Sequence, residues 1–96
     1  MKYRDFLTLH VLHHVSEKPV TGAFMMKELE RHGYYISPGT IYPLLHSLEK
    51  EGLLKSHWDV MDGRRVRVYE ITEVGQRALN EGKERLKELC KELLGD

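Results

Sequence analysis

Apolar residues recur about every three positions along the first third of the chain, and this spacing predicts helices. The first helix is expected over residues 4–16, where it would bury one stripe. After an interruption at 17–20, Thr21 is a suitable N-cap for a second helix, and Gly33 is a suitable residue to end it. The apolar stripe of the first helix consists of Phe6, Leu9, Leu12 and Val15.

A third helix is predicted over residues 37–52, SPGTIYPLLHSLEKEG. Ser37 is a common capping residue, and Pro38 suits the first helical position because its missing N–H has no helical partner there. Pro43 lies further inside, so we expect an irregular start rather than a broken helix. Gly52 favours the left-handed conformation that ends many helices. The buried stripe of this helix is predicted to be Ile41, Leu45 and Leu48.

The hydrophobic pattern then changes to a period of two, which predicts a hairpin. Residues 53–60 and 65–71 are short runs rich in β-branched and aromatic residues, with an Asp-Gly turn between them. In the second run Arg65 and Arg67 alternate with valines, so both arginines are expected to project from one face.

The order of the predicted elements indicates the fold. Thr72 can cap a last helix that runs to about Leu94, after three helices and a two-stranded ribbon. This is the order of a winged helix-turn-helix. We therefore predict a mainly α fold with a small β-ribbon. Residues 1–72 would form a winged helix-turn-helix DNA-binding domain and 73–96 a C-terminal dimerisation helix, the two making one compact unit.

The last predicted helix carries an apolar stripe that so small a core would not cover completely. Its spacing alternates between three and four residues, as in the a and d positions of paired helices. Because soluble monomers rarely expose such a strip, we predict a homodimer, with the first helix adding to the interface. The predicted interface residues are Phe6, Leu7, Leu79, Leu86, Leu89 and Leu93.

Composition narrows the classes of function. Fifteen basic and fifteen acidic residues cancel, so contacts with a polyanion must come from local clusters. The single cysteine, Cys90, excludes an internal disulfide framework and fits a reducing compartment. No apolar run reaches the length of a membrane span, and the N-terminus lacks the features of a signal peptide. We therefore expect a cytoplasmic protein without a membrane partner.

The outer face of residues 37–52 is the strongest candidate site. A merely solvated face would favour lysine, glutamate and glutamine, whereas this face offers threonine, tyrosine and histidine. Such side chains suit a recognition helix in the major groove of double-stranded DNA, with the helix N-terminus near a phosphate. The candidate DNA contacts on this face are Ser37, Thr40, Tyr42, His46 and Lys50.

Arg64, Arg65 and Arg67 form a second candidate site on the predicted hairpin. No acid lies within residues 63–69, which is the most basic segment of the ribbon. Guanidinium groups on such a wing can bind phosphates or enter a minor groove. Charge also protects an edge strand from aggregation, so both roles can hold together. We favour the DNA contact.

His10, His13 and His14 have the spacing that brings side chains together on one helix face. These histidines could bind a metal ion, or they could simply form a polar edge of the first helix. No other ligand is near in sequence, so we favour the polar edge. We predict no cofactor and no metal ligand. No nucleophile–base pair or phosphate loop is evident either, so we predict a protein that is not an enzyme.

Three stretches in this order resemble the PadR family of bacterial and archaeal transcriptional regulators. They are PVTGAFMMKELE, SPGTIYPLLHSLEKEGLL and DGRRVRVYEITEVGQRAL, and the resemblance covers roughly residues 7–82. The single final helix is similar to that of the short PadR subfamily. The resemblance implies a homodimer that represses promoters and is released by a small ligand or a stress signal. We expect any such effector to be aromatic or amphipathic and to bind between protomers.

Two rival functions stay open at this point. A neutral winged helix can serve as a protein-interaction module without specific DNA binding, and the three histidines could make a metal-responsive regulator. A mobility-shift assay with the protein's own upstream DNA separates the first rival from a DNA-binding regulator. Metal-dependent DNA binding would identify the second.

Overall fold

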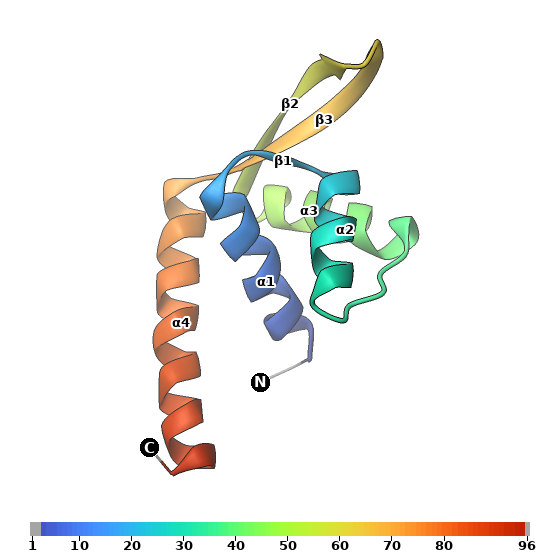
Figure 1. The fold of residues 1–96 in the computed structure, drawn as a ribbon. Helices are drawn as coiled ribbons and strands as arrows, with labels where there is room; N and C mark the ends of the chain where they lie inside the picture. The colour runs from blue at the N-terminus through green and yellow to red at the C-terminus, as the bar shows by residue number, and fades with distance from the viewer. Residues whose placement is uncertain (1–2, 96) are drawn as a thin grey trace.

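A computed structural model describes residues 3–95, and its side chains are described from Phe6 onward. Residues 1, 2 and 96, which complete the predicted ranges 1–72 and 73–96, lie outside the described residues. The elements in chain order are α1 (Tyr3–Glu17), β1 (Val20–Thr21), α2 (Gly22–Arg31), α3 (Pro38–Lys50), β2 (Leu54–Met61), β3 (Arg64–Ile71) and α4 (Glu73–Leu94). Figure 1 shows β2 and β3 projecting from the helical body, at the end opposite to the C-terminal end of α4.

Capping residues begin the helices close to the predicted positions. Thr21 Oγ1 accepts a hydrogen bond from the backbone N–H of Phe24 at 3.1 Å, and Thr72 Oγ1 accepts one from Gly75 at 3.0 Å. Each bond satisfies a backbone donor that has no partner within the helix. Ser37 is also an N-cap, but its side chain makes no capping hydrogen bond, so Pro38 at the next position and the packing of α3 start this helix.

The predicted end of α3 is confirmed in detail. Gly52 has a φ of 83°, and the N–H of Leu53 donates to the carbonyl of Leu48 at 2.9 Å, as in a Schellman motif. The helix is continuous across Pro43. Its first turn is tight, because the carbonyl of Ser37 accepts from two successive backbone N–H groups, at 3.0 Å each.

The ribbon is part of a three-stranded sheet rather than the predicted two-stranded one. β2 and β3 form the expected antiparallel hairpin, and both residues of its Asp-Gly turn have positive φ, 51° and 73°, as a type I′ turn requires. The strand order is β1-β3-β2, so β1 pairs with the other edge of β3. The strand β1 has only two residues, which are too few to show a hydrophobic period, so the sequence pattern did not indicate it.

The core lies where α1, α2, α3 and the first half of α4 meet the base of β3. Tyr69 is fully buried there, and burial raises the pKa of its hydroxyl. Met25 is buried too and therefore serves packing. The buried apolar residues include Val11, Leu12, Val15, Val20, Met25, Leu29, Ile41, Leu44, Leu45, Leu48, Leu54, Tyr69 and Leu79.

The first half of α4 packs on α1, and its second half extends beyond it (Figure 1). Gly82 permits the close approach, because a Cβ at that position would collide with the side chain of Leu9. Further along, Leu93 is 70% exposed and Leu94 is 75% exposed. None of the helices within residues 3–95 is long and apolar enough to cross a membrane.

Candidate nucleic-acid interface

The helix α3 separates its apolar and polar positions as the sequence predicted. Ile41, Leu45 and Leu48 are buried, and Leu44 joins them, which widens the predicted stripe. The five side chains predicted to contact DNA all lie on the exposed side of α3 or at its N-cap. Ser37 is the N-cap of α3, so the first backbone N–H groups of the helix are near this exposed surface. The exposed residues are Ser37, Thr40, Tyr42, His46 and Lys50.

Tyr42, on this exposed face of α3, packs against α2. The ring of Tyr42 lies against Gly22, the first residue of α2, where an added Cβ would be 2.8 Å from Cζ of the ring. Tyr42 remains 37% exposed. The glycine therefore lets the ring rest on α2 while part of it stays available to a ligand. Sequence analysis did not connect these two residues, which are twenty positions apart.

The hairpin presents two of its three arginines without an ion-pair partner among the described side chains. Arg64 and Arg65 are exposed, and the guanidinium of Arg65 lies 4.5 Å from the centre of the Trp58 ring. Trp58 is opposite Arg67 in the strand register and contacts it as well, at 5.3 Å. Arg65 and Arg67 therefore share one face of the ribbon, as predicted, and the tryptophan stacks against both.

Arg67 also joins the hairpin to α3. Its Nε donates to Ser56 Oγ at 2.8 Å, and its Nη2 lies 3.4 Å from Oε1 of Glu49. Ser56 donates in turn to the carboxylate of Glu49, with distances of 2.8 and 2.9 Å. This network spans β3, β2 and the last turn of α3, so it fixes the angle between hairpin and helix. Sequence analysis missed Glu49 and Ser56 because their contact depends on the fold.

The structure changes the role of two predicted dimer residues. Leu7 is 6% exposed and Leu79 is 1% exposed, so both belong to the domain's own core and cannot form a contact surface. Phe6, Leu86 and Leu89 are partly exposed, and Leu93 is open to solvent. The exposed part of the predicted stripe is therefore shorter than the stripe itself.

Two grooves lie at the contact between α1 and α4. The larger has a volume of about 640 Å³ and is lined by apolar side chains that include Leu9, Leu12 and Leu89. Phe6, Leu9 and Leu86 line the other, which lies closer to His10 and His13. The apolar surface of α4 thus continues onto α1, as the sequence analysis expected.

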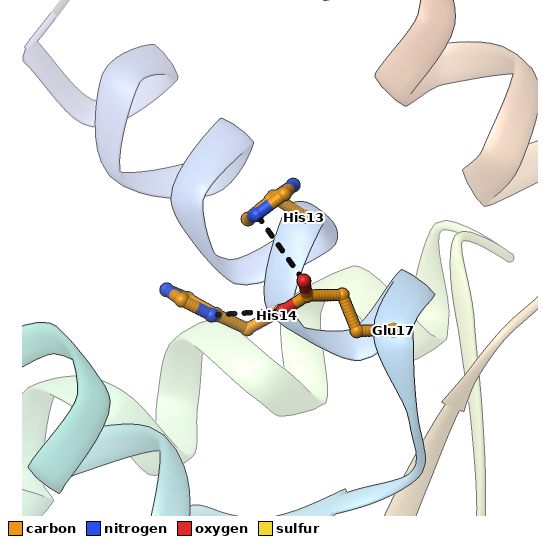
Figure 2. A group of neighbouring side chains, drawn as sticks. All are labelled: His13, His14 and Glu17. Atoms are coloured by element: carbon orange, nitrogen blue, oxygen red, sulfur yellow. Dashed lines mark ion pairs between the residues drawn. The ribbon is translucent and has the colours of Figure 1, made fainter.

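The three histidines of α1 come together, and a fourth from another element joins them. In Figure 2, Glu17 lies between His13 and His14, at 3.9 Å from Nε2 of His13 and 3.7 Å from Nδ1 of His14. The ring of His32, just beyond α2, is 5.4 Å from the rings of both His10 and His14, centre to centre. His32 is eighteen positions from His14, so no sequence spacing indicated this contact.

Comparison with known proteins gives consistent matches. The family described as "Transcriptional regulator PadR-like family" matches residues 11–81. The transcriptional regulator Rv3488 of Mycobacterium tuberculosis is 51% identical over 92 residues, which cover 96% of this chain and 86% of that protein.

Solved structures agree with this match. A PadR family regulator from Eggerthella lenta is 34% identical, with a TM-score of 0.84 over 94% of this chain and 80% of that one. A PadR-like regulator from Bacillus cereus is 28% identical, with a TM-score of 0.85 over 93% of this chain and 88% of the other.

Proposed function

Because this chain belongs to the PadR-like family of transcriptional regulators, we propose that it is a repressor that binds a pseudo-palindromic operator as a homodimer. It acts in the cytoplasm, on double-stranded DNA. The observation that carries the proposal is the exposed face of α3, where threonine, tyrosine and histidine stand in place of the usual solvated charges.

The two parts of the interface have different tasks in this proposal. Thr40, Tyr42 and His46 lie in the major groove and read base edges, while Ser37 and Lys50 approach phosphates near the two ends of α3. Arg64 and Arg65 bind phosphates from the hairpin. Arg67 contributes a weaker contact, because Glu49 and Ser56 already occupy much of its guanidinium.

Thr40→Ala should weaken binding to the operator while leaving binding to random duplex DNA nearly unchanged. The lost base contact should cost about 1–3 kcal/mol at each half-site. The measurement is a mobility-shift titration of the protein's own upstream region against a random duplex of equal length. Lys91→Ala, which removes a charge at the far end of α4, is the matched control. Equal losses on both duplexes would contradict a base-reading role, and no preference of the parent for any upstream fragment would overturn the function.

The homodimer is supported by the apolar surface that α1 and α4 leave open. Leu86 and Leu89 are partly exposed, and Leu93 is 70% exposed. A second copy related by a two-fold axis would bury this surface against itself, as isologous interfaces do. The two α3 helices would then enter successive major grooves on one side of the duplex, about 34 Å apart.

In this proposal, a small aromatic or amphipathic ligand releases the repressor from its operator by binding where the two protomers meet. The 640 Å³ groove between α1 and α4 supports this position, since it is largely apolar, open and continuous with the proposed interface. A ligand there would change the distance between the two α3 helices. Calorimetry that finds the same tight site on a monomeric variant would contradict a site between protomers.

A further inference from the structure

The side chain of His14 has a buried nitrogen that the rest of the domain does not satisfy. The residue is 8% exposed, and its Nε2 has no hydrogen-bond partner among the described residues. An unsatisfied buried polar atom of this kind lowers the stability of the folded domain. The other nitrogen, Nδ1, faces Glu17 at 3.7 Å, and Figure 2 shows Nε2 pointing away from that carboxylate. Nε2 is therefore the nitrogen left for a further ligand.

Two potential metal ligands from α2 and its C-cap lie beside this histidine. One ring nitrogen of His14, one ring nitrogen of His32 and one carboxylate oxygen of Glu28 all lie within 4.8 Å of one another. The side chain of Glu28 is only 19% exposed, and its present partner is Arg31, at 3.1 Å. Arg31 is 75% exposed, so its guanidinium can turn into solvent without disturbing the packing.

His10 completes the group from one turn earlier on α1. Its ring centre is 5.4 Å from that of His32 and 6.3 Å from that of His14. Imidazoles bound to one tetrahedral Zn²⁺ through bonds of about 2.0–2.1 Å have ring centres roughly 5 Å apart. His10 is outside the group of ligand atoms that lie within 4.8 Å of one another, so its ring has to rotate to reach the same ion.

We propose that a divalent transition-metal ion of the Zn²⁺ type binds between α1 and α2, held by His14, His32 and Glu28 with His10 as the fourth ligand. Imidazole nitrogen and carboxylate oxygen are the ligands such ions accept, and four of them match a closed tetrahedral site. The carboxylate of Glu17, 3.7 Å from Nδ1 of His14, lies on the side of the ring where carboxylates support metal-bound histidines.

Burial lowers the pKa of both His10 and His14, and the neighbouring histidines lower these pKa values further, whereas Glu28 and Glu17 act in the opposite direction on His14.

The alternative triad on α1, formed by His13, His14 and Glu17, is less suited to hold an ion (Figure 2). His13 and Glu17 are 47% and 60% exposed, and all three ligands come from consecutive turns of one helix. Binding there would also leave Nε2 of His14 without a partner. An ion in the proposed site joins two helices instead, at the end of α2 that leads through 33–37 into α3.

The experiment is a metal titration of the full-length protein in the absence of DNA, so its outcome does not depend on the proposed regulatory function. Zn²⁺ is titrated in competition with a chromophoric chelator, and Co²⁺ is used to detect a tetrahedral site by its visible absorption. We expect one ion per chain. At a free Zn²⁺ concentration of about 100 times Kd, thermal unfolding should shift upward by on the order of 10 °C.

Single substitutions assign the ligands. His32→Ala and Glu28→Gln change residues outside the fully buried core, and each should weaken binding at least about tenfold and reduce the thermal shift. His13→Ala, the matched control for a histidine of the same cluster, should leave the affinity within about twofold. Absence of Zn²⁺ binding by the parent would overturn the proposal. So would a loss of binding with His13→Ala but not with His32→Ala.

Discussion

Leu86→Glu combined with Leu93→Glu should convert the protein into monomers that keep their helix content. Both positions lie on the part of α4 that its own domain does not fully cover, so carboxylates there face solvent in the monomer. In a two-fold dimer the same substitutions bring four carboxylates into an apolar interface, which strongly disfavours association. Sedimentation velocity at micromolar concentration measures the change, and circular dichroism checks the helices.

Loss of the dimer should also reduce operator affinity by about 100-fold or more, because a monomer binds only one half-site and loses the second, intramolecular contact. Arg77→Glu is a useful control for the sedimentation measurement, since it alters the net charge by the same amount at an exposed position on the opposite side of α4. A double variant that still sediments as a dimer would place the interface elsewhere.

Arg64→Ala combined with Arg65→Ala should weaken binding to operator and to random duplex alike. A dimer would lose four positive charges, so the slope of log affinity against log salt concentration should fall by about 3–4. At low salt we expect an affinity loss on the order of 100-fold for both duplexes. The stability of the domain should change little, because neither arginine has an ion-pair partner among the described side chains and Arg65 stacks only on the exposed ring of Trp58.

The control for this experiment removes the same charge from another region. Lys87→Ala with Lys91→Ala takes two exposed lysines from α4, away from the hairpin, and should leave the salt slope unchanged. If the hairpin variant kept the parent's slope, the arginines would not contact phosphates. If it lost affinity for the operator alone, they would read sequence instead.

Sequence by itself determined the local features of this protein. Thr21 and Thr72 cap their helices because the acceptor and the backbone donor are three residues apart. Gly52 ends α3, and the Asp-Gly turn makes the hairpin, because each depends on the φ angles that one or two residues can adopt. The amphipathic face of α3 followed from its period, and the order of elements then indicated the winged helix.

Only the tertiary structure decided which distant residues meet. β1 has too few residues to show a period and exists because β3 offers it a free edge. Leu79 belongs to the same leucine stripe as Leu93, yet the body of the domain covers only the first of them. Glu49 reaches Arg67, and His32 reaches His14, across gaps of eighteen residues. A one-dimensional pattern records the period of a helix and the preferences of a turn, whereas these contacts depend on how the helices and the sheet pack against one another.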